Sequence, residues 1–155
     1  MVTRPSAARG FTLPELLAVV AIMSILAATA APAVTALIAG QRARSASSDL
    51  FTSLNRARSE AIKRNTAVTL RPETAGSWQS GWRIPNPSDT GHPIEVHNPL
   101  TGATVTGPAS VVYLPNGRIR AADSVSFDIS FANAAKHRCV TIDLSGRPYL
   151  KNDAC

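Results

Sequence analysis

The sequence predicts an α+β protein in which one long N-terminal helix packs on a C-terminal antiparallel β-sheet or small β-sandwich. Residues 16–39 carry no charge, and an amphipathic helical pattern then continues to about residue 64. After Asn65, short runs of β-forming residues alternate with Gly and Pro. A chain of 155 residues is long enough for one domain with an appendage and too short for two full domains.

The first element is a short basic segment followed by an apolar stretch. Residues 1–10 read MVTRPSAARG, and Leu16–Ala39 reads LLAVVAIMSILAATAAPAVTALIA. A helix of this second length reaches about 36 Å, which exceeds the roughly 30 Å of a membrane's hydrocarbon core. A secretory signal peptide cut near Ala30 is one alternative, but the apolar stretch is longer than such a peptide needs and Glu15 stands at its leading edge.

A plain membrane anchor is the second alternative, and hydropathy alone leaves it open. The charges that flank the stretch do not decide its orientation, because two arginines stand on each side of it. They are Arg4, Arg9, Arg42 and Arg44.

Glu15 is the informative residue of this segment, because a carboxylate at the edge of a membrane span needs a partner or a function. The string from Gly10 to Glu15, GFTLPE, resembles the type III signal of type IV prepilins. The resemblance implies that a prepilin peptidase cuts between Gly10 and Phe11 on the cytoplasmic face and that Phe11 is N-methylated. Glu15 would then neutralise the new amine of a neighbouring subunit inside an apolar fibre core, since buried charges are tolerated when paired.

Two prolines interrupt this helix in different ways. Pro14 falls in the first helical turn, where its missing N–H would be unpaired in any case. Pro32 lies inside the apolar stretch, removes the hydrogen bond to the Ala28 carbonyl and predicts a kink. In the pilin family, a proline at this place marks a segment that can loosen within the fibre. A kink without purpose is the alternative, because membrane helices often tolerate one.

From Gln41 the helix changes from uniformly apolar to amphipathic, which is the pattern of a helix that lies on a sheet. The predicted apolar stripe comprises Ala43, Ala46, Leu50, Leu54, Ala57 and Ala61. We therefore expect a helix from about Leu13 to about Arg64. The predicted organisation is a leader at 1–10, a membrane or fibre-core half at 11–40, and a head at 41–155, with amphipathic helix at 41–64 and β-structure at 65–155.

The rest of the head is predicted to be an antiparallel meander or small sandwich. The candidate strands are Thr66–Arg71, Trp78–Ile84, Ile94–His97, Ser110–Leu114, Ser124–Phe131, Cys139–Leu144 and Pro148–Lys151. Both tryptophans are expected in the core.

Three head motifs narrow the family: Trp78-Gln79-Ser80-Gly81-Trp82, Leu114-Pro115-Asn116-Gly117, and Arg138–Ile142 followed by Ser145-Gly146-Arg147. Together with the N-terminal signal they resemble the GspH/FimT group of minor pilins and pseudopilins. The resemblance implies a structural subunit that assembles into, or primes, a type IV pilus or a type II secretion pseudopilus. Its implied partners are the prepilin peptidase, other minor pilins, the major subunit and inner-membrane lipid. It also implies a single-pass protein of the bacterial inner membrane with a periplasmic head.

DNA uptake, with double-stranded DNA as a partner, is the alternative role, because some FimT-like minor pilins are linked to DNA uptake through a Gly-Arg-x-Arg element near the C-terminus. Here Gly146-Arg147-Pro148-Tyr149 places a tyrosine where the second arginine would stand. Along an extended strand Arg147, Tyr149 and Lys151 share one face and offer two charges and one ring to a phosphate backbone. Arg138 completes this candidate set.

The charge balance agrees with polyanion binding and equally with ordinary solubility. Sixteen Lys and Arg oppose ten Asp and Glu, and loss of Arg4 and Arg9 with the leader leaves fourteen against ten.

Cys139 and Cys155 predict one disulfide closing a C-terminal loop, worth about 3 kcal/mol in the chain-entropy model. Such a bridge implies an oxidising compartment such as the periplasm. Two free thiols, or pairing between chains, are the alternatives.

No pattern predicts catalysis, a metal or a cofactor. The histidines, His92, His97 and His137, lack the spacing of a structural zinc site. The string Asp143-Leu144-Ser145-Gly146 lacks the nucleophile elbow of hydrolases. We therefore expect a peptidase substrate and not an enzyme.

Overall fold

The computed structural model describes residues 11–134 and 137–155, and for residues 29–32 it describes the backbone but not the side chains. The chain divides into two compact units, residues 1–35 and residues 36–155. The division falls inside one helix, so each unit contains part of it. The two units are described separately below.

Helix α1, Leu13–Arg64, has the ends that the sequence predicts. It stops where Asn65 adopts a left-handed conformation, with φ of 49°. The N–H of Thr66 then donates to the carbonyl of Ala61 at 3.2 Å, and that of Asn65 to Ile62 at 3.2 Å. These bonds form a Schellman-type cap, which satisfies carbonyls that would otherwise be unpaired at the helix end.

In residues 36–64 the predicted apolar stripe of α1 is buried. All six predicted positions are less than 2% exposed: Ala43, Ala46, Leu50, Leu54, Ala57 and Ala61. Four of the six are alanines, so the helix axis can approach the strands closely. The stripe confirms that this part of the helix packs on β-structure.

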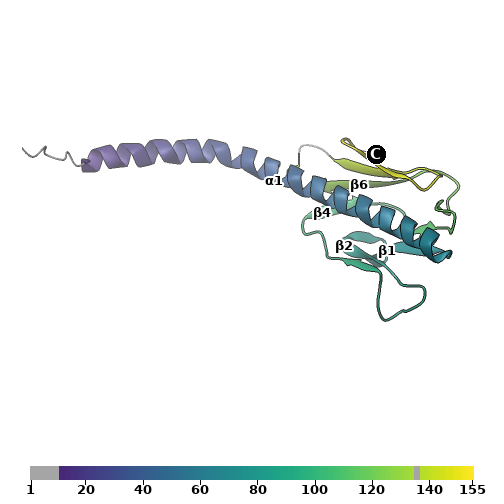
Figure 1. Cartoon of the computed structure of the whole chain (residues 1–155). Helices are drawn as coiled ribbons and strands as arrows, with labels where there is room; N and C mark the ends of the chain where they lie inside the picture. The colour runs from purple at the N-terminus through teal and green to yellow at the C-terminus, as the bar shows by residue number, and fades with distance from the viewer. Residues whose placement is uncertain (1–10, 135–136) are drawn as a thin grey trace, which may run out of the picture. The chain divides into compact units, whose positions relative to one another are not determined.

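The described residues of the head form two four-stranded antiparallel sheets. The first has the order β3-β2-β1-β5 and the second β4-β6-β7-β8. The first sheet comprises β1 (Val68–Thr74), β2 (Ser77–Ile84), β3 (Glu95–His97) and β5 (Val111–Tyr113). The second comprises β4 (Ala103–Thr106), β6 (Val125–Phe131), β7 (Arg138–Ile142) and β8 (Pro148–Lys151). Strands of both sheets run beside the second part of α1 (Figure 1).

One core joins α1 to both sheets. Leu50 and Leu54 pack in the same cluster as Trp82 of the first sheet and Phe127 of the second. Trp78 crosses between the sheets and meets Phe127 edge to face, with ring centroids 4.8 Å apart. The indole N–H of Trp78 donates to the Pro108 carbonyl at 2.7 Å, so its polar edge is satisfied although the residue is buried. The expected core role of both tryptophans is confirmed.

Strand β4 was not predicted. Its four residues lie between Gly102 and Gly107-Pro108, which makes the segment look like part of a loop. Only Val105 is buried on it, so the alternation of apolar residues is too short to recognise. Gly107 is required here, because a Cβ at this position would lie 2.4 Å from the ring of Phe127.

Candidate functional site

The first turn of α1 positions the acid that the sequence singled out. The N–H of Leu16 donates to the Thr12 carbonyl at 3.1 Å, so Thr12 is the N-cap residue. The N–H of Thr12 in turn donates to Oε2 of Glu15 at 3.4 Å, which is half of a capping box. An acid in the first turn also interacts favourably with the helix dipole. Glu15 is therefore held beside the chain segment where cleavage would create an amine.

Phe11 is 81% exposed, and Gly10 lies outside the described residues. Cleavage between them would leave the new amine four residues before Glu15, on the residue next to the N-cap. The cleavage, the methylation and the charge pairing stay predictions.

The part of α1 in residues 1–35 has no buried side chain among those described. Each of its large apolar residues is between 45% and 73% exposed: Leu13, Leu16, Leu17, Val19, Val20, Ile22, Met23, Ile25, Leu26 and Val34. Within the described part of the chain, α1 is the one helix long and apolar enough to cross a membrane. The helix continues through position 32, whose side chain is not described, so the predicted kink at Pro32 stays a prediction.

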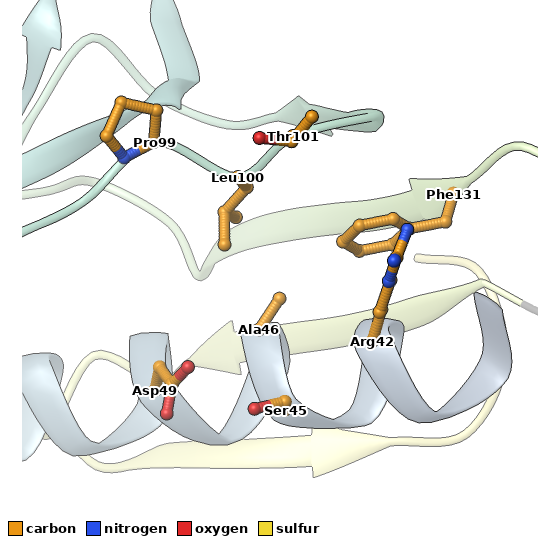
Figure 2. Close-up of a pocket in the computed structure, with 8 residues that line it drawn as sticks. All are labelled: Arg42, Ser45, Ala46, Asp49, Pro99, Leu100, Thr101 and Phe131. Carbon is orange, nitrogen blue, oxygen red and sulfur yellow. The ribbon is translucent and has the colours of Figure 1, made fainter. Parts of the chain in front are cut away.

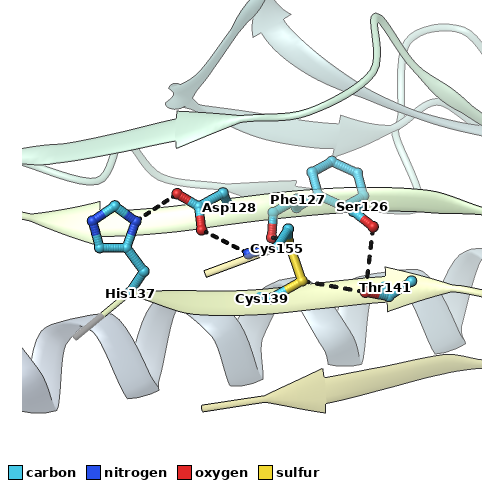
Figure 3. Close-up of a disulfide and its surroundings, with 7 residues drawn as sticks. All are labelled: Ser126, Phe127, Asp128, His137, Cys139, Thr141 and Cys155. Atoms are coloured by element: carbon cyan, nitrogen blue, oxygen red, sulfur yellow. Dashed lines mark hydrogen bonds and ion pairs between the residues drawn. A yellow bond between two sulfur atoms is a disulfide. The ribbon is translucent and has the colours of Figure 1, made fainter. Parts of the chain in front are cut away.

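The C-terminus of the chain is fixed to the second sheet by a disulfide (Figure 3). Cys139 and Cys155 are joined, with their Cα atoms 5.1 Å apart. Around the bridge, Asp128 accepts from the N–H of Cys155 at 3.3 Å, and its other oxygen lies 2.7 Å from Nδ1 of His137. The Thr141 hydroxyl must donate to Sγ of Cys139, at 3.2 Å, because a bridged sulfur carries no proton. The predicted intrachain bridge is therefore present.

Strand β8 carries the candidate basic residues at the edge of the second sheet. Tyr149 lies opposite Thr141, and Lys151 lies opposite Cys139, so both share the outer face of the sheet. The ammonium of Lys151 is 5.5 Å from the centre of the Tyr149 ring, within cation–π range. Tyr149 is 41% exposed.

Arg147 and Arg138 differ in the face of the second sheet on which they lie. Arg147 is exposed and directly precedes β8, on the side that Tyr149 and Lys151 share. Arg138 pairs with Ile129, whose side chain is in the core, so it starts from the opposite face. Its guanidinium donates to the side-chain oxygen of Asn152. The structure thus brings three of the four candidates together and places Arg138 apart.

Sequence reasoning missed a contact between two Gly-Arg turns. A Cβ on Gly146 would lie 2.0 Å from the carbonyl oxygen of Gly117 and 3.2 Å from Cα of Arg118. Both glycines have positive φ, 80° and 76°, so the turns need glycine for conformation and for space. With 3.8 Å between consecutive Cα atoms, the Cα atoms of Arg118 and Arg147 are at most about 9 Å apart. Two exposed arginines from distant motifs are therefore neighbours.

Arg58 of α1 holds both turns in place by hydrogen bonds. Its Nε donates to the Gly117 carbonyl at 3.0 Å, and its terminal nitrogen to the Ser145 carbonyl at 3.4 Å. Asp143 braces the second turn by accepting from the Ser145 hydroxyl at 2.6 Å and from the Arg147 N–H at 3.0 Å. Both bonds, that of Ser145 first, lower the pKa of the Asp143 carboxyl. The repeated Gly-Arg pair was the available signal, but nothing local shows that its two copies touch.

The family model for GspH, the type II transport protein, matches residues 46–146. This chain belongs to the GspH family. The model of the prokaryotic N-terminal methylation motif matches residues 5–31. The GspH match ends at Gly146, so it covers Gly117, Arg118 and Gly146 but not Arg147 or strand β8.

Two solved structures share the fold of this GspH-family protein. Both are crystal structures of the type IV minor pilin FimU of Pseudomonas aeruginosa strain PAO1, in space groups P65 and P21. The first has a TM-score of 0.60 at 22% identity and covers 70% of this chain and 91% of the crystallised chain. The second has a TM-score of 0.58 at 24% identity and covers 70% and 87%. No curated protein sequence matches this chain.

The GspH-family protein is thus a GspH/FimT-type minor pilin or pseudopilin with the pilin fold. The family is structural, and its methylation motif implies processing by a prepilin peptidase and assembly with other pilins. The motif and the apolar helix together indicate anchoring in the inner membrane.

Each histidine of this GspH-family protein lies beside a carboxylate. His92 pairs with Asp89 at 2.7 Å, and His97 lies 3.4 Å from Asp49. His137 pairs with Asp128, as described above. Residues 11–134 and 137–155 contain no group of three His, Cys, Asp or Glu side chains that could hold a metal ion.

Proposed function

We propose that this minor pilin is cut between Gly10 and Phe11, is methylated on Phe11, and enters a type IV pilus or a type II secretion pseudopilus. The head stands in the periplasm, and the apolar part of α1 passes from the inner membrane into the fibre core. Glu15 sets the register of a subunit by pairing with the amine of a neighbour. The observation that carries the proposal is Glu15 itself, capping a helix whose next apolar residues are all exposed.

The exposed apolar side chains of α1 are unfavourable in water. An apolar side chain of Leu or Ile size contributes about 1.5–3 kcal/mol when it leaves water, so an uncovered apolar helix must be covered by lipid or by other helices. A carboxylate that enters such surroundings needs an opposite charge. The terminal amine of Phe11 on an adjacent subunit supplies that charge, because cleavage creates it in every copy.

The test is the Glu15→Ala variant in the native host, with Glu60→Gln as the matched control. Glu60 is an acid of the same helix, but it pairs with Arg64 of its own chain at 2.5 Å. We expect Glu15→Ala to be inserted and cleaved yet reduced at least tenfold in the sheared fibre fraction, and Glu60→Gln to be incorporated normally. Normal incorporation of Glu15→Ala would contradict the charge-pairing role. The Gly10→Leu variant should accumulate as an uncut precursor, which runs as a slower band on a denaturing gel.

We propose double-stranded DNA as a second ligand of the head, and the proximity of Arg118 to Arg147 favours it. Two exposed guanidiniums, with Lys151 and the Tyr149 ring on the adjoining strand, suit a phosphate backbone with little sequence preference. The test is a mobility shift with duplex DNA over a salt series, using the full chain in detergent micelles. Arg147→Ala and Arg118→Ala should each weaken binding and lower the salt slope by about 1. Arg71→Ala, an exposed arginine on β1, serves as the control. No shift at low salt would overturn the DNA proposal and leave the pilin proposal standing.

A further inference from the structure

A groove opens in the head beside the first turns of α1 that follow the apolar stretch (Figure 2). Its volume is about 370 Å³, at the lower end of the range of ligand pockets. It is lined by Arg42, Ser45, Ala46 and Asp49 of α1, by Pro99, Leu100 and Thr101 of the β3–β4 connection, and by Phe131 of β6. The groove therefore has one helical wall and one wall of loop and strand.

The floor of the groove is apolar and its helical wall carries opposite charges. Ala46, Leu100 and Phe131 supply the apolar surface, and the latter two are only partly buried against the core. Arg42 and Asp49 are seven residues apart, so they lie two turns apart on one side of the helix. The side chain of Arg42 extends toward the ring of Phe131 (Figure 2).

The two charges differ in how they are held. Asp49 lies 3.4 Å from Nε2 of His97, whose ring stacks on Trp82 with centroids 3.9 Å apart. Nδ1 of His97 donates to the Asn98 carbonyl at 2.8 Å, which fixes the ring. Arg42, in contrast, is exposed and makes no ion pair or side-chain hydrogen bond with the described part of the chain. The groove thus offers one carboxylate beside a fixed imidazole ring and one guanidinium available to a partner.

The position of the groove indicates its occupant. Arg42 follows the last residue of the apolar stretch, Ala39, by less than one helical turn. If apolar helices of neighbouring subunits pack together, the first turns beyond them are where the next subunit is nearest. A partner that continues from the apolar contact would meet Arg42 first and Asp49 about 10 Å further along.

We propose that this groove binds a neighbouring pilin-type subunit, through an apolar side chain that fills the floor and a carboxylate that pairs with Arg42. The proposal rests on the pilin function above and names where the head of the neighbour docks. Burial of one large apolar side chain together with one ion pair adds a second point of register, in the head, to the one that Glu15 provides in the fibre core.

The first experiment places a photo-crosslinking amino acid at Thr101, in the groove, or at Val96, a 52% exposed strand residue outside it. The full-length variants are expressed in the native host, and crosslinked products are identified by mass spectrometry. We expect the Thr101 probe to capture a pilin-type subunit and the Val96 probe to give at least tenfold less of that product. Capture of lipid alone at Thr101, or equal capture at both positions, would overturn the proposal.

The second experiment fills the groove with a large side chain or reverses the charge on its wall. Ser45→Trp and Arg42→Glu change exposed residues of its wall, and Ser59→Trp changes an exposed serine of the same helix outside it. The expected result is a fall of at least fivefold in fibre incorporation for the two groove variants alone, with the melting temperature of all three within a few degrees of the original. Normal incorporation of both groove variants would overturn the groove proposal only. Absence of the unsubstituted chain from fibres would overturn the pilin function, and the groove proposal with it.

Discussion

The two parts of α1 have the same backbone conformation and opposite surroundings. From Leu13 to residue 28 every described side chain is exposed, whereas in residues 36–64 Leu50 and Leu54 are completely buried. The difference arises outside the helix, because strands of the second unit pack on residues 36–64, whereas the described part of the first unit contains no strand that could cover its part of the helix. Helical conformation therefore follows from the local sequence, while burial depends on what the helix meets. The first part must find its apolar surroundings in lipid or in other subunits.

The largest expected effect is on the stability of the head, and it comes from making the same Leu→Ala change in each part of α1. Leu54→Ala removes a buried side chain between α1 and the sheets, and should destabilise the head by about 3–5 kcal/mol. Leu17→Ala makes the same chemical change at a position that is 60% exposed, and should change the head by less than about 0.5 kcal/mol. Both tryptophans are in the head core, so their fluorescence during denaturant unfolding in micelles reports on the head alone.

The comparison fails if Leu17→Ala destabilises the head as much as Leu54→Ala does. That result would mean that the apolar part of α1 is covered by the head of its own chain. The effect of Leu17→Ala should instead appear in fibre assembly, because the proposed function places this side chain against neighbouring subunits.

The elements were predictable where the sequence pattern is long and local. The stripe from Ala43 to Ala61 spans five turns of α1, and Asn65 marks its end, so α1 was predicted from Leu13 to Arg64. Strand β4 was missed because four residues between glycines carry too short an alternation to be distinguished from a loop. The pairing of strands into two sheets is a property of contacts between distant segments, which a single sequence does not contain.

The candidate site divides in the same way. Glu15 was identified from the sequence alone, because it stands at the edge of a long uncharged stretch. Its capping bond to Thr12 was not predicted, although the two residues are only three positions apart. The proximity of Arg118 to Arg147 depends on Gly117 touching Gly146 across the head, and no local pattern shows it. The disulfide is intermediate, because two cysteines permit one intrachain pairing but do not exclude pairing between chains.

The second prediction uses the disulfide to show that the two parts lose stability independently. Cys139→Ser with Cys155→Ser removes a bridge over a separation of 16 residues, and should cost the head about 3 kcal/mol. The helical signal of residues 11–35 in micelles should persist, because that part forms a unit of its own and its helical hydrogen bonds are local. Tryptophan fluorescence and far-ultraviolet circular dichroism, recorded together during unfolding, distinguish the two responses. Simultaneous loss of both signals to the coil values would contradict independence.

The smallest expected effect concerns the Tyr113 hydroxyl, a polar group in the apolar core of the head. It is the converse of the first part of α1, where apolar side chains are exposed. Tyr113 is completely buried, and its hydroxyl has no hydrogen-bond partner in residues 11–134 and 137–155. Burying a hydroxyl without a partner costs about 1–3 kcal/mol, so Tyr113→Phe should leave the head unchanged or stabilise it by about 1 kcal/mol. Thr141→Val, which removes a bonded buried hydroxyl, is the matched control and should destabilise the head.

The same hydroxyl gives the head a dependence on alkaline pH. Burial raises the pKa of Tyr113 above its ordinary value, so the folded state favours the neutral phenol. Ionisation of Tyr113 does not affect the free energy of unfolding below about pH 10, where the folded and the unfolded chain both keep the proton. Above that pH the unfolded chain loses its proton first, so the free energy of unfolding decreases. Tyr113→Phe should therefore move the alkaline unfolding midpoint, followed by tryptophan fluorescence, to higher pH. An unchanged midpoint would show that the phenol ionises without unfolding the head and that water reaches it.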